Sequence, residues 1–322
     1  MVRTQLSAIA DFIRENCDFT LISHISPDGD TLGSALALLC IIKRMGKQAS
    51  VVCEDSVPQI YSFLPYADCV ITPDAAKPGG AVISIDCADE ERMGGAMRIF
   101  CAAEHTANID HHITNACYAD YNAVDGEAAA TGELIYELAG MLLPDMDKQT
   151  AMCLYTALIT DTGNFAYGNT TPDTHRTAAA LLQTGVDTYD INRRIFRTIP
   201  YQKKKLLGIS IMNMQRLADG RIGISIISAE DMQSVGASGE DTEGIIDHIR
   251  DVAGVEIAIL IRECGEDTYK VSLRSKLYAD VSAIAKRMGG GGHKRAAGYT
   301  AHGRAEQVYA QTMELAQAAL EG

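Results

Sequence analysis

Apolar and polar residues alternate along residues 1–192 in a way that is typical of an α/β domain. Short, nearly continuous apolar runs predict strands covered on both faces, and apolar residues spaced three or four apart predict helices between them. Strands are expected at residues 19–22, 49–54, 81–87 and 106–109. Helices are expected at residues 4–16, 30–45, 130–142, 148–160 and 171–185. This order predicts a doubly wound, mainly parallel sheet.

The pattern changes beyond residue 207, where it predicts a second and smaller α/β domain. Strands are expected at 221–227, 256–262 and 268–274, and helices at 240–251, 279–288 and 303–320. Residues 193–207 combine mixed charge with Pro200 and a run of lysines, which is typical of a connector. We therefore expect domains at 1–192 and 208–322, joined by a linker at 193–207, with a cleft between them.

Composition limits the classes of function. A chain of 322 residues is long enough for two cores, and its 47% hydrophobic and 22% charged residues are typical of a globular protein. No apolar run is long enough to span a bilayer, so we expect a cytoplasmic protein without a membrane partner. The net charge of −14 argues against binding long duplex nucleic acid, whereas short nucleotides need only a local basic cluster. The nine cysteines include no CxxC pair, which predicts reduced thiols rather than zinc ligands or disulfides.

Histidines and aspartates cluster at the carboxyl ends of predicted strands, where ligands bind in open α/β sheets, and at the end of one predicted helix. They lie in four separated segments: His24, Asp28 and Asp30; Asp86; Asp110, His111 and His112; and Asp161. Pro27 and Gly29 hold Asp28 and Asp30 in one tight turn, where two like charges favour a cation between them. Oxygen and imidazole ligands without thiolate suit Mn²⁺, Mg²⁺ or Fe²⁺, and the set is too large for one ion. Two ions would suit in-line displacement at phosphorus.

Some of these residues also have a simpler interpretation. Asp30 or Thr31 could be the N-cap of the following helix, with the rest of that segment an ordinary turn. His111 and His112 could be solvated side chains of a loop. Each simpler interpretation accounts for one segment, whereas metal binding accounts for all of them.

Consecutive glycines in the second domain predict a phosphate-binding loop. Gly289–Gly292 precede His293, Lys294 and Arg295, so that backbone N–H groups and positive charge would meet at one place. A flexible spacer is the alternative, and the adjacent basic residues disfavour it. Arg274, in the preceding predicted strand, can bind a phosphate through two hydrogen bonds, which lysine cannot do.

These segments together resemble a known family. The four metal-binding segments resemble, in order and spacing, the four motifs of the DHH phosphoesterase superfamily, and Gly289–Gly298 resembles the signature loop of the DHHA1 domain. A chain with these two domains and no further module resembles the NrnA-type family of bacterial oligoribonucleases and pAp phosphatases.

The resemblance implies a role for each site residue. The implied metal ligands are His24 and Asp28 for a first ion, Asp30, His111 and Asp161 for a second ion, and Asp86 as a bridge. The implied catalytic side chains are Asp86, Asp110 and His112, with Asp110 orienting His111 and with His112 facing the scissile phosphate. The implied substrate-binding residues are Arg274, Ser275, Gly291, Gly292 and His293.

The resemblance also implies a phosphoesterase that uses two Mn²⁺ ions, with Mg²⁺ or Fe²⁺ as alternatives. Its expected substrates are short single-stranded oligoribonucleotides, degraded to nucleoside monophosphates, and 3′-phosphoadenosine 5′-phosphate (pAp), converted to AMP. A phosphodiesterase for cyclic di-AMP or linear dinucleotides (pApA, pGpG) would use the same motifs and stays an alternative. A non-catalytic nucleotide-binding module is disfavoured because no expected ligand is missing, and an inorganic pyrophosphatase because of the glycine loop. A homodimer is compatible with the sequence, which does not determine the oligomeric state.

Overall fold

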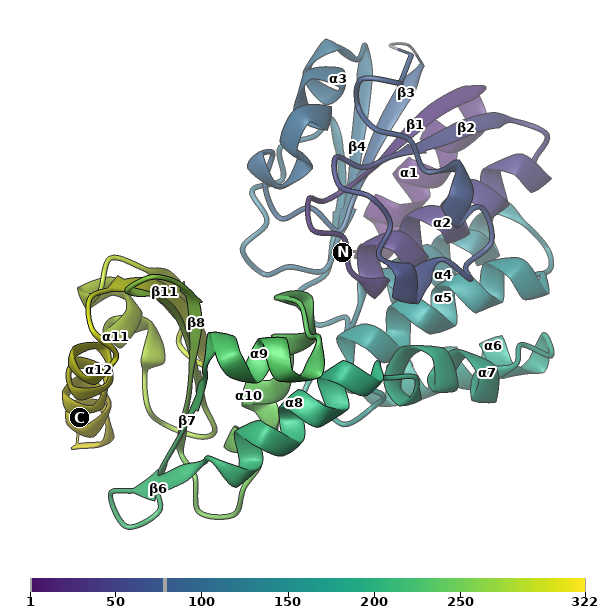
Figure 1. Cartoon of the computed structure of the whole chain (residues 1–322). Helices are drawn as coiled ribbons and strands as arrows, with labels where there is room; N and C mark the ends of the chain where they lie inside the picture. The colour runs from purple at the N-terminus through teal and green to yellow at the C-terminus, as the bar shows by residue number, and fades with distance from the viewer. Residues whose placement is uncertain (1, 78–79, 322) are drawn as a thin grey trace. The chain divides into compact units, whose positions relative to one another are not determined.

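A computed structural model of the chain describes residues 2–77 and 80–321 (Figure 1). The chain divides into two compact units, unit 1 (Met1–Thr198) and unit 2 (Ile199–Gly322). The boundary falls inside the segment 193–207, which the sequence predicts as a linker. This segment is mostly helical, because it contains η4 (Arg193–Arg197) and the start of α8 (Tyr201–Met212).

Unit 1 is built on a parallel sheet with the strand order β2-β1-β3-β4-β5 (Figure 1). Its strands are β1 (Asp18–Ser23), β2 (Gln48–Val52), β3 (Ala81–Ile85), β4 (His105–Asp110) and β5 (Tyr121–Val124). The first four lie where the apolar runs predict strands. β5 is an additional edge strand, whose 4 residues are too few to produce a clear strand pattern in the sequence.

Helices cover both faces of this sheet. They are α1 (Val2–Glu15), α2 (Gly29–Arg44), α4 (Thr131–Leu142) and α5 (Lys148–Asp161) on one face, and η3 (Glu91–Ala96) and α3 (Met97–Ala102) on the other. Leu21 and Ile83 belong to the first core, whereas the alternate residues Ile22 and Val82 belong to the second. The predicted doubly wound fold class is therefore confirmed. Unit 1 also contains η1 (Gln59–Tyr61), η2 (Ala67–Cys69), α6 (Pro172–Gln183) and α7 (Thr188–Asn192).

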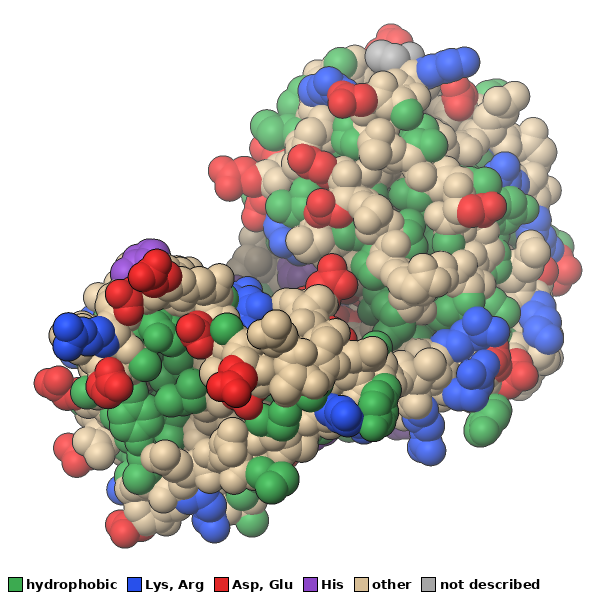
Figure 2. Space-filling model, viewed as in Figure 1, with side chains coloured by type: hydrophobic (Ala, Val, Ile, Leu, Met, Phe, Trp, Pro, Cys, Tyr) green, Lys and Arg blue, Asp and Glu red, His purple; other side chains and the backbone are tan. Residues whose placement is uncertain are grey.

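The face of the molecule in Figure 2 has no broad basic area, as expected for a chain with a net charge of −14. On the face that Figure 2 shows, acidic side chains lie interspersed with basic ones over both units. This face therefore differs from the broad basic surface that long duplexes require. Within residues 2–77 and 80–321, no helix has the length and apolar character needed to cross a membrane.

Two helices that carry site residues, α2 and α5, pack with their backbones in close contact. α2 begins at Gly29, with Asp28 as its N-cap, and most of its residues are buried. A Cβ atom at Gly33 would lie only 2.5 Å from the carbonyl oxygen of Cys153 and 2.9 Å from the backbone nitrogen of Ala157. Glycine at position 33 therefore permits the two helices to approach each other.

Unit 2 is built on a mixed sheet with the strand order β10-β11-β9-β8-β7-β6, in which β7 and β8 pair in parallel and the other neighbours are antiparallel. Its strands are β6 (Gln215–Leu217), β7 (Ile222–Ile227), β8 (Ile257–Gly265), β9 (Thr268–Ser275), β10 (Gly291–His293) and β11 (Ala296–His302). One face shares a core with α11 (Val281–Arg287) and α12 (Ala305–Glu321), and the other with α8, α9 (Ala229–Val235) and α10 (Ile245–Arg250). The predicted α/β class of the second domain is confirmed.

Two predicted elements of unit 2 differ from the structure. The predicted helix 240–251 is divided into η5 (Glu240–Thr242) and α10, because Gly244 between them has a left-handed φ of +73°. The predicted glycine loop is a hairpin in which β10 pairs with β11. Gly292 has a φ of +136°, and a Cβ atom there would lie 2.5 Å from the carbonyl oxygen of Ala296. The glycine thus lets two backbones come together, which a sequence pattern alone does not distinguish from an open loop.

Gly33→Ala should destabilise unit 1, because the added methyl group would clash with the backbone of α5. Overpacking of this kind lowers the free energy of unfolding by about 1–3 kcal/mol. Gly140→Ala is the matched control, since Gly140 lies in α4 with no atom within 4 Å of its Cβ position. The control should be neutral or stabilising by up to about 1 kcal/mol. Urea unfolding measures both variants, and equal effects would contradict the close contact of α2 with α5.

Candidate metal centre

The predicted site residues of unit 1 lie together at the carboxyl end of its sheet. They come from the β1–α2 turn, the residue after β3, the end of β4 and the end of α5. They are His24, Asp28, Asp30, Asp86, Asp110, His111, His112 and Asp161. Segments far apart in the sequence thus converge at the edge where open α/β sheets bind their ligands.

His24, Asp28 and Asp86 form a first group. Nε2 of His24 lies 3.7 Å from Oδ2 of Asp28 and 3.6 Å from Oδ2 of Asp86. The other oxygen of Asp28 caps α2, because it accepts hydrogen bonds from the backbone N–H groups of Asp30 (3.0 Å) and Thr31 (3.1 Å). The N-cap is therefore Asp28 and neither Asp30 nor Thr31. One carboxylate both begins the helix and faces the imidazole.

Asp30, His111 and Asp161 form a second group. Nε2 of His111 lies 3.7 Å from Oδ2 of Asp30 and 3.5 Å from Oδ2 of Asp161. The same nitrogen lies 3.7 Å from Oδ1 of Asp86. Asp86, which is almost completely buried, thus presents one carboxylate oxygen to each group.

Hydrogen bonds at Nδ1 determine which nitrogen of each imidazole faces the carboxylates. Nδ1 of His24 lies 2.7 Å from the carbonyl oxygen of Ile25, and Nδ1 of His111 lies 3.1 Å from that of Ala128. A carbonyl oxygen can only accept, so Nδ1 of each neutral ring carries the proton and Nε2 carries a lone pair. In the neutral rings these lone pairs face carboxylate oxygens at 3.5–3.7 Å and repel them unless a proton or a metal ion lies between. The donor set therefore fits divalent metal ions held by oxygen and imidazole.

The ionisation of the site reflects burial together with its excess of negative charge. Burial lowers the pKa of His24, but the carboxylates of Asp28 and Asp86 outweigh this effect and raise the pKa to about 9. Burial, followed by the charge of Asp86, raises the pKa of Asp30 well above its usual range. Burial is also the main cause that raises the pKa of Asp161 to about 6. A bound cation would oppose each of these shifts.

The start of α4 positions two carboxylates and was missed by the sequence analysis. Asp30 is buried, and its two oxygens accept hydrogen bonds from the backbone N–H groups of Thr131 (2.7 Å) and Gly132 (3.0 Å). The hydroxyl of Ser34 also donates to Asp30 (3.0 Å). The hydroxyl of Thr131 donates to Oδ1 of Asp86 (2.7 Å). The sequence indicates a helix that begins near Thr131, but it contains no signal for the partner of that helix terminus.

Asp110 contacts a different histidine from the one that the resemblance implies. Its Oδ1 lies 2.7 Å from Nδ1 of His112, whereas from His111 it accepts only the backbone N–H (2.8 Å). Residues i and i+2 of an extended chain point the same way, which brings the carboxylate to His112. Asn115, which the sequence analysis also missed, donates to the other oxygen of Asp110 (2.5 Å). The hydrogen bond that His112 donates to Asp110 raises the pKa of His112.

Two further features of the site have no clear signal in the sequence. Nη2 of Arg92 lies 3.1 Å from Nδ1 of His24 and adds positive charge beside the first group. Gly163, Asn164 and Phe165, which follow α5, all have left-handed φ values, of +56°, +58° and +65°. Such backbone is costly for residues other than glycine and clusters at functional sites. This turn sets the path of the chain directly after the last ligand candidate.

The predicted substrate-binding residues of unit 2 lie on and beside the glycine hairpin. Strand register pairs Ala296 of β11 with Arg274 of β9 on one side and with His293 of β10 on the other. Residues paired across neighbouring strands project from the same face, so Arg274 and His293 share one face of the sheet. Gly291 and Gly292 precede His293 in β10.

The loop after β9 is held rigidly beside this hairpin. The hydroxyl of Ser275 donates to the carbonyl oxygen of Lys294 (3.4 Å), and Ser275 is itself buried. The buried carboxylate of Glu256 accepts hydrogen bonds from the backbone N–H groups of residues 277–279. Arg295 donates to carbonyl oxygens of the same loop. Ser275, Glu256 and Arg295 therefore support the hairpin from within unit 2.

Comparisons with known proteins agree with this geometry. The family model described as the DHH family, N-terminal domain, matches residues 18–158, and that of the DHHA1 domain matches residues 219–321. The bifunctional oligoribonuclease and PAP phosphatase NrnA of Thermus thermophilus is 33% identical, over 91% of this chain and 87% of that protein. The protein of the same name from Bacillus subtilis is 25% identical, over 85% of this chain and 86% of that protein. A crystal structure of an exopolyphosphatase-related protein from Bacteroides fragilis has a TM-score of 0.88 and 24% identity, and covers 99% of this chain and 96% of that chain.

These matches define a two-domain phosphoesterase fold with an acidic and histidine-rich centre. The chain belongs to the DHH family, which confirms the family predicted from its motifs. It is a hydrolytic phosphoesterase. Members of this family depend on metal ions, and the two groups around Asp86 could bind them.

Addition of Mn²⁺ should raise the midpoint of thermal unfolding, because an ion that binds only the folded chain stabilises it. The gain is about 2.7 kcal/mol when the ion is present at 100 times its Kd. Asp161→Asn should reduce this gain, because the second group loses a charged ligand. The same variant should be slightly more stable than the parent before metal is added, because one partly buried negative charge is removed.

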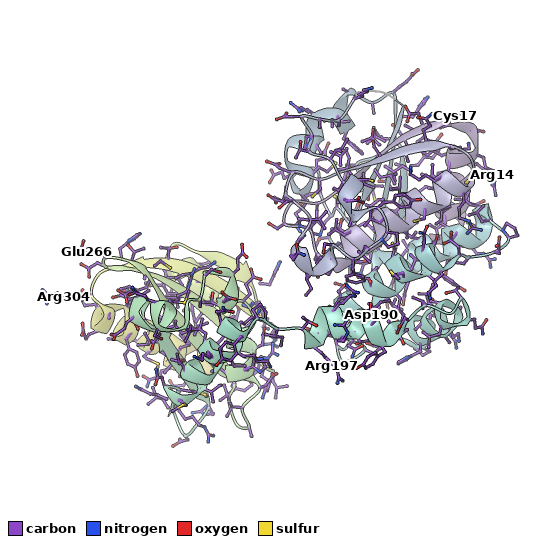
Figure 3. All side chains as sticks on the ribbon, turned by 45° about the vertical axis from the view of Figure 1, so that its right-hand side comes forward. Arg14, Cys17, Asp190, Arg197, Glu266 and Arg304 are labelled. Carbon is purple, nitrogen blue, oxygen red and sulfur yellow. The ribbon has the colours of Figure 1, made fainter. Side chains whose placement is uncertain are left out.

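Asp190→Asn is the control for this measurement. Asp190 lies in α7 (Figure 3). It pairs with Arg193 and Arg194. Its substitution should leave the shift caused by Mn²⁺ unchanged. If Mn²⁺ raises the unfolding midpoint of Asp161→Asn as much as that of the parent chain, Asp161 is not a ligand.

Proposed function

We propose that this chain hydrolyses short oligoribonucleotides to nucleoside monophosphates and converts pAp to AMP, with two Mn²⁺ ions as cofactors. The names of its Thermus and Bacillus relatives support the substrate class. The observation that carries the proposal is the buried carboxylate of Asp86, which directs one oxygen toward each of two groups of ligands. A shared carboxylate of this kind suits a pair of ions held close together.

The proposed ligands follow the two groups. His24, Asp28 and Asp86 would hold the first ion, and Asp30, His111, Asp161 and the other oxygen of Asp86 would hold the second. When bound, the ions would supply Lewis acidity and lower the pKa of water at the scissile phosphate. Ile25 and Ala128 hold the imidazoles of His24 and His111 in the tautomer that this arrangement needs.

His112 is proposed to neutralise charge on the phosphate. Its Nδ1 is engaged by Asp110, so Nε2 of this partly exposed ring is the nitrogen that can meet a substrate. The raised pKa favours the charged form of the ring, which donates a hydrogen bond to a phosphate oxygen. Asp110 therefore acts as the positioning residue for His112, and Asn115 holds Asp110 in turn.

Residues 208–322 are proposed as the substrate-binding domain, and residues 1–192 as the catalytic domain. Arg274 and His293, on one face of the sheet, would bind a phosphate of the substrate together with backbone N–H groups of Gly291 and Gly292. The guanidinium suits bidentate contact with a phosphate. Its Nε lies 3.6 Å from Oδ1 of Asp247, and its Nη1 donates to the carbonyl oxygen of Leu273 (3.1 Å), so Nη2 is the nitrogen proposed to meet the phosphate first.

A product-resolved assay tests the proposed function. The purified chain with Mn²⁺ is given oligoadenylates of increasing length, pAp, linear pApA and cyclic di-AMP, and the products are separated by chromatography. We expect AMP from pAp and from the short oligomers. Cyclic di-AMP as the preferred substrate would favour the signalling alternative, and binding of pAp without turnover would favour a non-catalytic module.

Asp86→Asn should reduce turnover by at least about 10²–10³-fold, the range for loss of one electrostatic stabiliser. Asp86 has a left-handed φ of +61°, which asparagine tolerates, so the fold should persist. Asp86→Ala should lose as much activity. Circular dichroism confirms folding, and near-normal turnover in either variant would show that the metal centre is misassigned.

His293→Ala should weaken the use of nucleotides more than that of bis(p-nitrophenyl) phosphate, because its proposed role is to bind substrate. The loss should appear mainly as a higher KM for pAp. His302→Ala, at the exposed end of β11, is the control and should change neither reaction. Equal losses on pAp and on the generic diester would contradict a binding role for His293.

A further inference from the structure

The register of β8, β9 and β11 places basic residues in the first and third of three successive rows on one face of the unit 2 sheet. One row contains Arg274 of β9, which pairs with Ala296. A second row contains Ser272, which pairs with Gly298. A third row contains Lys270, which pairs with Arg262 of β8. Because alternate residues of a strand project from the same face, these rows follow one another along that face.

These rows line a cavity of about 380 Å³. Its lining residues are Thr242, Glu243, Gly244, Ile246, Leu260, Arg262, Lys270, Ser272 and Arg274. The segment before α10 and the start of that helix form one wall of the cavity. Ser272 and Leu260, which pair with each other, lie in the middle row of the sheet. Gly298, next to Ser272, adds no side chain above the sheet. The result is an open trough with a small, polar centre and cations along its length, which we call the β9 trough.

Most of the positive charge in the β9 trough is not neutralised by the protein. Among the described residues, neither Arg262 nor Lys270 has a carboxylate within 4 Å of its charged nitrogens. Arg274 has Asp247 at 3.6 Å, and Glu243 lies in the opposite wall. In a chain whose net charge is −14, such a concentration of cations in a concave site favours an anionic ligand.

The length of the β9 trough favours a chain of phosphates over a single anion. Lys270 and Arg274 are four positions apart on β9, a distance of about 13 Å along the strand at ~3.3 Å per residue. One phosphate cannot contact both ends, whereas an extended single strand of about three nucleotides can. A positively charged groove that follows the backbone is the usual way to bind single strands without reading their sequence.

We propose that the β9 trough binds the phosphodiester backbone of an oligonucleotide beyond the nucleotide held at Arg274 and His293. Arg262 and Lys270 then contact phosphates that pAp and dinucleotides do not possess at that distance. The trough makes the enzyme sensitive to substrate length and not to base sequence. This inference rests on the proposed function, because it concerns the same oligoribonucleotide substrate.

The Arg262→Gln/Lys270→Gln double variant tests the β9 trough. Its kcat/KM is compared with that of the parent chain for a 5′-phosphorylated diadenylate and for the tetraadenylate. We expect the loss on the tetramer to exceed the loss on the dimer by roughly tenfold, as for two partly exposed charge contacts. The slope of log KM for the tetramer against log salt should also become shallower by about 0.7 for each phosphate that the variant no longer neutralises. A merely structural role would leave that slope unchanged.

Lys286→Gln/Arg304→Gln is the matched control, because it removes the same charge from two exposed positions. Lys286 lies on α11, and Arg304 lies just before α12, where Figure 3 labels it. This control should change kcat/KM for the dimer and for the tetramer by the same factor. Lys270→Arg, which retains the charge, should keep most of the parent chain's kcat/KM for the tetramer. The proposal is overturned if the double variant loses equal activity on the dimer and the tetramer, or none on the tetramer. If the parent chain hydrolyses neither length, the proposed function fails and the trough fails with it.

Discussion

The mutual repulsion of closely spaced carboxylates is the constraint on which the centre of unit 1 depends. Asp28, Asp30, Asp86 and Asp161 converge around two imidazoles whose lone pairs also face inward. Their charge is held in place by donors built into the fold, chiefly the start of α4 and the first turn of α2. Those donors leave one oxygen of Asp28 free of backbone bonds and turn both oxygens of Asp86 toward the imidazoles. The carboxylates that suit ion binding therefore destabilise the folded chain until a cation binds among them.

Helix packing gives this centre its precision. α2 carries ligand candidates in its first turn, α5 carries one at its last residue, and the contact at Gly33 holds the two helices at one distance. A left-handed turn follows the last of these ligand candidates directly. Ligands supplied by rigid helix ends and strand ends vary little in position, which suits a reaction that requires in-line geometry.

Unit 2 complements unit 1 in charge and in construction. Unit 1 concentrates carboxylates where ions are proposed to bind, and unit 2 concentrates guanidinium and ammonium groups where phosphates are proposed to bind. A buried glutamate and Arg295 hold the loop beside the glycine hairpin, so that this surface is preorganised within unit 2. Preorganised contacts lose less conformational entropy on binding, which matters for small substrates with few groups to recognise.

The sequence by itself determined the α/β class, the family and the set of charged side chains at the strand ends, because apolar runs and motif spacing are local properties of the chain. It could not supply β5, whose pattern is too short, or the hairpin, because glycines permit several backbone paths. Only the tertiary structure decided that Asp110 holds His112, and that Thr131 donates to Asp30 from 101 positions away. Strand register likewise brought Arg262 and Lys270 into one row. Each of these facts depends on contacts between distant segments, and such contacts have no signature in a single sequence.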